Sequence, residues 1–351
     1  MDPSKGLLCN RFQVGKRLGC GTYGEVYSAV DKSTRRTCAL KLETLTAATP
    51  QLKGEAKALE ALRSVHGVPT LYWSGSDSTY NVISMELLGP SFDQLLERCK
   101  GKFSLKTTLL VGDQMIQRLE SIHQLHYIHR DIKPDNYTLG VHRAEKLIYL
   151  IDFGLAKRYR HPVTKQHIPY RENSGLGVVG TLRYASVNAH LGMELSRRDD
   201  LEALFYMLIY FVRGSLPWQG ALRLSKSEKY SRVLELKQTV SYSELCKDLP
   251  ACFSTALRYI RALQFDATPN YDYLLSLLRD TLIAFKLRFS AEYDWTLVQS
   301  STLPSTPCPV KSSKQEESSG STMEGPPPSL RAEIREKVRR IRSMGGERRL
   351  I

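Results

Sequence analysis

The stretch that constrains the fold most tightly reads HRDIKPDN and runs from His129 to Asn136. It matches the catalytic-loop pattern H-R-D-x-K-P-x-N at every specified position. In such a loop Asp131 is predicted to accept or orient the proton of a substrate hydroxyl group, Lys133 to contact the phosphate that is transferred, and Asn136 to bind a metal ion. An ordinary polar loop between helices would not require an acid, a lysine and an amide at these offsets. The stretch therefore predicts a site for phosphoryl transfer.

A glycine-rich segment near the N-terminus, Gly19–Val26 (GCGTYGEV), fits the pattern G-x-G-x-x-G-x-V. Alone, this pattern fits either a dinucleotide-binding turn or a hairpin that covers phosphates. Both uses need backbone without Cβ atoms, which can approach phosphates and offer N–H donors to them. A dinucleotide fold needs a helix directly after the glycines, whereas Glu25–Val30 continues as a strand. We therefore predict a phosphate-covering hairpin, with nucleotide contacts from Leu18, Gly19, Gly21, Gly24 and Val26.

A lysine on the next predicted strand, Lys41 in the sequence CALK, stands where a lysine would pair with the α- and β-phosphates. An isolated strand lysine would more often be a solvated surface charge. Fourteen residues later Glu55 lies on a helix predicted over 51–65 from its apolar spacing. A carboxylate there can hold Lys41 extended, and Glu60 on the same helix is a rival for this role.

The fourth motif is IDFG at Ile151–Gly154, in which Asp152 is predicted to bind the magnesium ion that bridges the β- and γ-phosphates. Positioning and charge neutralisation dominate phosphoryl transfer, so Asp152, Lys41 and the glycine loop must act together. Four motifs in this order are typical of protein kinases, and they predict ATP as co-substrate with Mg²⁺ held by Asn136 and Asp152.

The pattern along the chain predicts an α+β, two-lobed protein kinase fold. Residues 12–43 alternate apolar and polar with glycine punctuation, as strands do, whereas 105–125 and 199–212 have helical spacing. Composition changes near Gln299, after which Ser, Pro and Gly dominate and few large apolar residues remain. The predicted units are a small β-rich N-lobe with one main helix (10–88), a larger mainly helical C-lobe (89–298) and a disordered tail that ends in a short basic segment (299–351).

Composition also limits the setting of the protein. Seven cysteines without a C-x-x-C pair favour reduced thiols. We read no signal peptide or membrane-spanning segment, so we expect a protein of the cytoplasm, the nucleus or both. We also expect a monomer. A formal net charge of +14 suggests an acidic partner. Nucleic acid, anionic membrane and phosphorylated or acidic protein are the candidates, but no RNA-binding or helix-turn-helix signature accompanies the charge, so direct nucleic-acid binding is not expected.

From about residue 10 to 298 the sequence resembles the casein kinase 1 family of serine/threonine protein kinases. Where most protein kinases carry A-P-E, this chain has GTLRYASVN at Gly180–Asn188, which is similar to that family's own motif. The other matching stretches are ELLGPS at 86–91, QHIPYREN at 166–173, SRRDDLE at 196–202 and GSLPWQG at 214–220.

The resemblance implies further site residues. The family spacing favours Glu55 over Glu60 as the partner of Lys41. The hinge match implies Met85 at the gatekeeper position, and ATP contacts from Ala39, Met85, Glu86 and Leu88.

The resemblance also implies the substrate class. Family members phosphorylate Ser or Thr downstream of an acidic or phosphorylated residue, without activation-loop phosphorylation. Arg183 and Lys229 match the basic anion site of the family, although Leu222–Glu228 diverges and the connection Ser174–Val179 is about two residues longer than usual. The alternative is that Arg183 and Lys229 are ordinary solvated charges that bind no anion. Two other interpretations stay open: a kinase-like scaffold with weak catalysis, or a relative of the tau-tubulin and vaccinia-related kinases.

Overall fold

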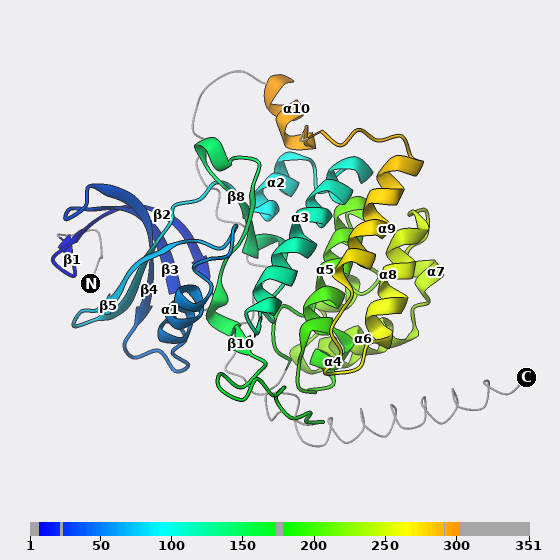
Figure 1. Ribbon diagram of the computed structural model, residues 1–351, viewed down its shortest axis with the longest axis horizontal. Coiled ribbons are helices and arrows are strands. Elements are labelled where there is room, and N and C mark those ends of the chain that lie inside the picture. Colours follow the sequence, from blue (N-terminus) through cyan, green and yellow to red (C-terminus); the bar gives the residue numbers. More distant parts are fainter. Residues whose placement is uncertain (1–6, 22–23, 173–177, 291, 302–351) are drawn as a thin grey trace, which may run out of the picture.

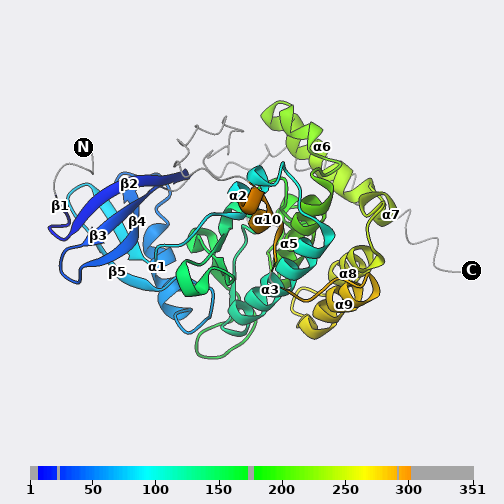
Figure 2. The ribbon, with the colours of Figure 1, turned by 90° about the horizontal axis from the view of Figure 1, so that it is seen from above.

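The computed structural model describes residues 7–21, 24–172, 178–290 and 292–301, and these form two lobes (Figure 1). Most of the predicted tail (299–351), including its short basic segment, lies outside the described residues. No described helix is long and apolar enough to span a membrane. Figure 2 shows the sheet of the N-lobe at one end, α3 and α5 in the middle, and α6 to α9 at the far end.

The N-lobe is built around a six-stranded antiparallel sheet with the order β1-β2-β3-β4-β6-β5. Alternation of side chains along the strands buries one apolar set, in which Phe12, Leu40 and Val82 are almost inaccessible to solvent. The strands are β1 (Leu7–Leu8), β2 (Phe12–Gly21), β3 (Gly24–Asp31), β4 (Arg36–Thr44), β5 (Leu71–Ser76) and β6 (Tyr80–Met85).

One helix, α1 (Leu52–Ala61), packs against this sheet. Its buried face carries Leu52, Ala56 and Leu59, spaced as one side of a helix requires, and Glu55 lies on the same face. A glutamate on an otherwise apolar buried face needs a cationic partner, because burial of an unpaired charge is costly. The predicted helix over 51–65 is therefore confirmed, although it ends earlier than its pattern suggested.

The C-lobe is mainly helical. Its centre is α5, in which apolar residues occur on nearly every side and all but a few of the side chains are buried. A capping box defines the first turn of α2, with Ser91 at its N-cap. At the start of α5 the carboxylate of Asp199 accepts a hydrogen bond from the backbone N of Ser196 (2.8 Å). The helices are α2 (Phe92–Arg98), α3 (Leu105–Gln124), α4 (Val187–His190), α5 (Arg197–Arg213), α6 (Lys226–Thr239), α7 (Tyr242–Leu245), α8 (Ala251–Ala262), α9 (Tyr271–Ala284) and α10 (Asp294–Ser301).

Short strands and 3-10 helices in the C-lobe carry the motifs. β7 (Tyr127–Ile128) pairs with β10 (Lys157–Arg158), and β8 (Tyr137–Leu139) pairs with β9 (Ile148–Leu150). The loop between β7 and β8 contains the HRDIKPDN stretch, and Asp152 follows β9. These two strand pairs lie on the side of the C-lobe next to the N-lobe (Figure 1), and they place the HRDIKPDN loop and Asp152 there.

The predicted two-lobed α+β architecture is confirmed. The chain passes between the lobes after β6, near the expected boundary at residue 88. The expected start of the tail at residue 299 falls inside α10, which continues to Ser301. The change in composition is at Gln299, but helices commonly extend by a residue or two beyond an apolar pattern.

Candidate active site

The glycine hairpin is formed by β2 and β3, which pair as far as Gly21 opposite Gly24. Gly24 has a φ of +140°, and a Cβ there would lie 2.1 Å from the carbonyl oxygen of Leu42 on β4. Only glycine can occupy this position, since the backbone of the hairpin rests directly on the neighbouring strand. Gly19 has open space around its Cα, so a ligand can approach its backbone closely. Thr22 and Tyr23, at the tip, lie outside the described residues.

Lys41 of β4 contacts one carboxylate from each lobe. Its Nζ is 2.7 Å from Oε2 of Glu55 on α1 and 2.7 Å from Oδ1 of Asp152 after β9. Glu60, the alternative partner, is exposed and pairs with Arg63 instead. The structure therefore brings together three predicted site residues from three separate elements, and it decides between the two glutamates.

Charge pairing outweighs burial for Lys41 and Asp152, whereas burial keeps the pKa of Glu55 above its ordinary value. Burial lowers the pKa of Lys41, but the carboxylates of Asp152 and Glu55 raise it above its ordinary value. Burial likewise raises the pKa of Asp152, and the ammonium group of Lys41 lowers it to about 2. Both groups are thus charged near neutral pH, so the site holds an ammonium group beside a carboxylate.

Glu43, two residues after Lys41 on the same strand, is a site residue that sequence reasoning missed. It is 3% exposed, and its Oε1 accepts hydrogen bonds from the backbone N of Gln51 (2.6 Å) and of Leu52 (3.1 Å). The side chain of Gln51, at the N-cap of α1, makes no capping bond of its own. Glu43 therefore caps α1 from the sheet, and β4 holds this helix both at its N-terminus and through Glu55. The signal in the sequence was a glutamate within a strand of mostly apolar residues, because a buried carboxylate needs hydrogen-bond donors.

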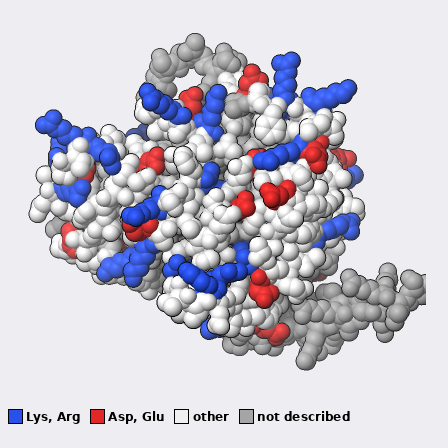
Figure 3. All heavy atoms as spheres, viewed as in Figure 1, with Lys and Arg blue, Asp and Glu red and all other residues white. Residues whose placement is uncertain are grey.

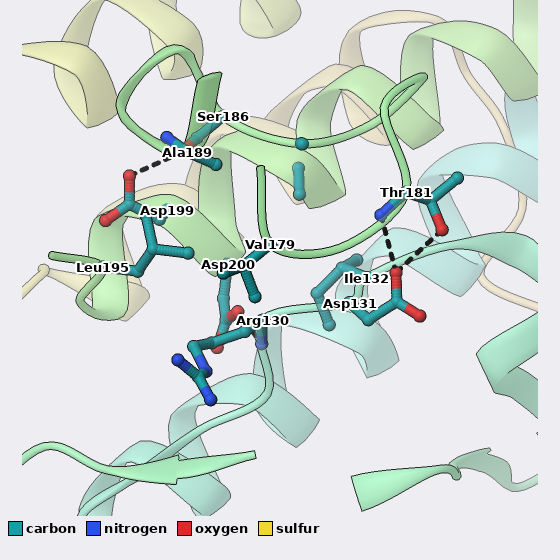
Figure 4. A pocket seen from close by; sticks show the side chains of 12 residues that line it. Arg130, Asp131, Ile132, Val179, Thr181, Ser186, Ala189, Leu195, Asp199 and Asp200 are labelled. Atoms are coloured by element: carbon teal, nitrogen blue, oxygen red, sulfur yellow. Dashed lines mark hydrogen bonds between the residues drawn. The ribbon is translucent and has the colours of Figure 1, made fainter. Parts of the chain in front are cut away.

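Asp131 lies in the loop after β7 and is 7% exposed. Its Oδ1 accepts hydrogen bonds from the backbone N (2.9 Å) and Oγ1 (2.8 Å) of Thr181, while its Oδ2 lies 2.8 Å from Nζ of Lys133. Figure 4 shows Asp131 and Thr181 together beside a small pocket that also borders Ser186 and Asp199. The carboxylate is thus held by the segment that leads to Arg183, a contact that the sequence did not predict.

A carboxylate on α5, that of Asp200, holds the backbone of this loop. Asp200 accepts hydrogen bonds from the backbone N of His129 (2.7 Å) and of Arg130 (2.8 Å). Arg130 has a φ of +69°, in the left-handed region, and such a conformation persists only where its surroundings impose it. His123 on α3 lies 3.0 Å from the same carboxylate. Asp200 is thus a second positioning residue whose role sequence reasoning missed.

Asn136 and Asp152 are the predicted metal ligands. Asn136, at the end of a 3-10 helix (Pro134–Asn136), donates from Nδ2 to the carbonyl oxygen of Asp131 (2.8 Å) and to its Oδ2 (3.2 Å). Its amide nitrogen is therefore engaged, which leaves the amide oxygen as the group available to a ligand. Mg²⁺ prefers oxygen ligands and uses only one or two carboxylates beside the phosphates of its substrate. One carboxylate and one amide oxygen fit this requirement.

An apolar wall completes the predicted nucleotide site. Ala39 and Met85 are directly opposite each other on β4 and β6, and Val26 packs against the same apolar cluster. Glu86 follows β6, and its side chain bonds to Thr70 and to the hydroxyl group of Tyr149 rather than pointing freely into solvent. Two members of the wall are less enclosed, because Leu88 is half-buried and Leu18 is 44% exposed.

The proposed anion-site residues lie on neighbouring elements. The guanidinium group of Arg183 lies over the rings of Tyr184 (5.8 Å) and Tyr210 (5.5 Å). Lys229 is half-buried in the first turn of α6, whose backbone it joins through a bond from its N to the carbonyl oxygen of Ser225. Most of the longer connection before Gly180 lies outside the described residues.

A glycine hairpin, a lysine paired with two carboxylates, and a loop in which an aspartate contacts a lysine are together typical of nucleotide-dependent phosphotransferases. The family model for the protein kinase domain matches residues 12–264. The chain therefore belongs to the protein kinase family. Members of this family use ATP and Mg²⁺ generally.

Proposed function

We propose that this chain is a serine/threonine protein kinase of the casein kinase 1 type, which transfers the γ-phosphoryl group of MgATP to acidic or phosphate-primed proteins. The observation that carries the proposal is the contact between Asp131 and Lys133, 2.8 Å apart in a loop that Asp200 holds in place. A lysine two residues after the aspartate is the arrangement of serine/threonine kinases, where it reaches the γ-phosphate.

The residues of the site divide the reaction between them. The glycine hairpin and Lys41 hold the phosphates, and Glu55 keeps Lys41 extended towards them. Asp152 and Asn136 would hold Mg²⁺, which neutralises charge on the β- and γ-phosphates when it is bound. Asp131 orients the substrate hydroxyl group and accepts its proton, while Lys133 offsets charge on the transferred group. Positioning is the main task, since little covalent chemistry is left to the protein.

Phosphorylation-independent activity is part of the proposal. The pairing of Lys41 with Glu55, the cap that Glu43 places on α1, and the bonds between Thr181 and Asp131 are all formed with unmodified residues. A kinase that needs activation-loop phosphorylation would be expected to lack at least one of these contacts before modification. A scaffold without catalysis is disfavoured, because Lys41, Asp131 and Asp152 are all present and in contact with charged partners.

The charge excess supports acidic substrates, although it does not single out one surface. Figure 3 shows Lys and Arg side chains over both lobes on one face, interspersed with Asp and Glu. Recognition of a primed substrate is therefore expected to depend on a local site near the substrate segment, with Arg183 and Lys229 as its proposed members.

A single set of assays tests the proposal. The full-length chain is given radiolabelled ATP with casein, a serine peptide, a matched phosphoserine-primed peptide and a tyrosine analogue. We expect transfer to serine, a higher kcat/KM on the primed peptide, and none to tyrosine. Lys229→Ala should lower kcat/KM on the primed peptide by roughly tenfold to a hundredfold, since one charge-assisted contact is worth about 1.5–3 kcal/mol. Equal losses on both serine peptides would place phosphate recognition elsewhere.

A further inference from the structure

The strongest unexplained feature is a buried lysine on α6. The side chain of Lys237 is 2% exposed, and its Nζ lies 2.9 Å from the carbonyl oxygen of Leu182 and 2.6 Å from that of Ala185. Its third neighbour is Nε2 of His190, at 3.2 Å. An ammonium group has three donors, so these three acceptors match its full capacity. Burial of this group without partners would be costly, so its three hydrogen bonds hold it in one position.

Aromatic rings enclose the same ammonium group. It lies 5.1 Å from the ring centre of Tyr206 and 5.0 Å from that of Trp218, distances at which ring faces attract cations. The indole Nε1 of Trp218 donates to the carbonyl oxygen of Arg183 (2.7 Å). The side chains of Lys237 and Trp218 therefore bind three carbonyl groups within the short segment 182–185.

Burial lowers the pKa of both groups at the contact between Lys237 and His190. Burial and the neighbouring Lys237 lower the pKa of His190 well below its ordinary value. The imidazole ring is therefore neutral and can accept a hydrogen bond through Nε2. Burial also lowers the pKa of Lys237 well below its ordinary value, while the carboxylate of Glu202 raises it. The amino group has N–H donors in either protonation state, so its bonds to the two carbonyl oxygens do not depend on its charge.

The held segment leads directly to the catalytic aspartate. Thr181 precedes Leu182 and donates two hydrogen bonds to Oδ1 of Asp131. The carbonyl oxygen of Thr181 in turn accepts from the backbone N of Tyr184 and of Ala185, each at 2.9 Å. Residues 181–185 thus form one compact turn, with Asp131 bonded to its first residue and Lys237 bonded to the carbonyl groups that follow.

A second consequence concerns Lys229. It lies on α6 about two turns before Lys237, roughly 12 Å along the helix axis. Because Lys237 binds the carbonyl groups on either side of Tyr184 and Arg183, it sets the distance between this turn and the helix that carries Lys229. The turn that carries Arg183 and the helix that carries Lys229 are therefore joined through Lys237.

We propose that Lys237 is a positioning residue for the protein substrate, which fixes the turn 181–185 against α6 and so aligns both Asp131 and the residues proposed to bind a phosphate. The inference rests on the proposed function, in that it concerns binding and turnover of a serine-containing protein. It differs from that function in predicting that one buried side chain controls the protein-substrate side of the site and leaves the nucleotide side unchanged.

The test compares Lys237→Met with Arg232→Met in the full-length chain. Methionine has a similar length and tolerates an apolar environment, so the substitution removes the charge and its hydrogen bonds with little change in volume. Arg232 lies on the same helix but is about half exposed and pairs with Glu235, so its replacement controls for loss of a positive charge on α6. Lys237→Arg, which keeps the cation, is the conservative variant.

We expect Lys237→Met to lower kcat/KM for a serine peptide by roughly tenfold to a hundredfold, since small displacements of positioning groups have effects of this size. KM for ATP should change by less than about twofold. Amide hydrogen exchange should rise at Tyr184 and Ala185 while α5 stays protected. Arg232→Met should behave as wild type, and Lys237→Arg should recover part of the loss.

Each other outcome overturns the inference. Wild-type peptide kinetics in Lys237→Met would show that the bonds of Lys237 do not position the substrate. Parallel loss of ATP binding and peptide turnover, including failure of the variant to fold, would make Lys237 a general stabilising residue. If wild-type protein transfers phosphate to no serine substrate, the proposed function fails first, and that result is distinct from unchanged kinetics in the variant.

Discussion

Replacement of Glu43 by alanine tests whether β4 controls the position of α1. The substitution removes the acceptor of the backbone N–H groups of Gln51 and Leu52, which lie at the buried start of the helix, and of Nδ2 of Asn81. Helix ends without capping partners are unstable. We expect the first turn of α1 to shift towards water, and Glu55 to move with it away from Lys41.

The size of the effect follows from these contacts. An unsatisfied buried donor costs about 1–3 kcal/mol, and loss of an N-cap about 0.5–2 kcal/mol. Partial access of water reduces the sum, so we expect Glu43→Ala to disfavour the paired position of α1 by about 2–4 kcal/mol. Every 1.4 kcal/mol is a factor of ten. The expected loss in kcat/KM for ATP is therefore roughly thirtyfold to seven hundredfold, with a smaller loss for Glu43→Gln, which keeps an acceptor oxygen.

Steady-state kinetics with ATP varied and peptide saturating would measure this loss. Glu60→Ala is the matched control, because Glu60 lies on the same helix but is exposed and contacts only Arg63 among described ion pairs. A double-mutant cycle with Glu55→Gln separates the mechanism from general damage. If Glu43 acts through Glu55, its loss should shrink in the Glu55→Gln background. An undiminished loss there, or wild-type kinetics in Glu43→Ala, would refute the reasoning.

Three further predictions concern the cleft and the core. Asp131→Asn should lower kcat by at least about a hundredfold, as expected for a catalytic base, while ATP binding measured by fluorescence titration stays near wild type; normal turnover would remove Asp131 from its role. Glu55→Ala should raise KM for ATP and lower kcat together, and an unchanged ATP response would show that Lys41 needs no partner. Burial lowers the pKa of His123 and of His190, so both contribute stability above pH 6.5 that falls as pH drops below it, by up to about 1.4 kcal/mol per histidine and pH unit. Urea unfolding from pH 7.5 to 5.5 should show this decline, with a shallower slope for His190→Gln; a pH-independent free energy of unfolding would contradict the assignment.

The sequence was most informative where chemistry demands particular residue types in one short stretch. The HRDIKPDN loop, the glycine hairpin and Asp152 could all be identified because catalysis and phosphate binding restrict nearly every position in them. Helices and strands with strong periodicity, such as α3 and the strands β2 to β4, were also predictable, since their patterns follow from burial of one face. The contacts of residues 182–185 were less predictable, because they are made by backbone carbonyl groups, which every residue type has.

Contacts between distant parts of the chain could be found only in the folded protein. The helical pattern alone left Glu55 and Glu60 as rivals until the family resemblance favoured Glu55, and the tertiary structure showed the contact itself, with Glu55 against Lys41 and Glu60 in solvent. Nor could it show that Glu43 caps a helix or that Lys237 holds the carbonyl groups of Leu182 and Ala185. Local patterns determined the class of protein, because they record which residues chemistry requires. The tertiary structure decided which charged side chains are buried and paired, since that depends on how β4, α1 and α6 pack against segments far away in the chain.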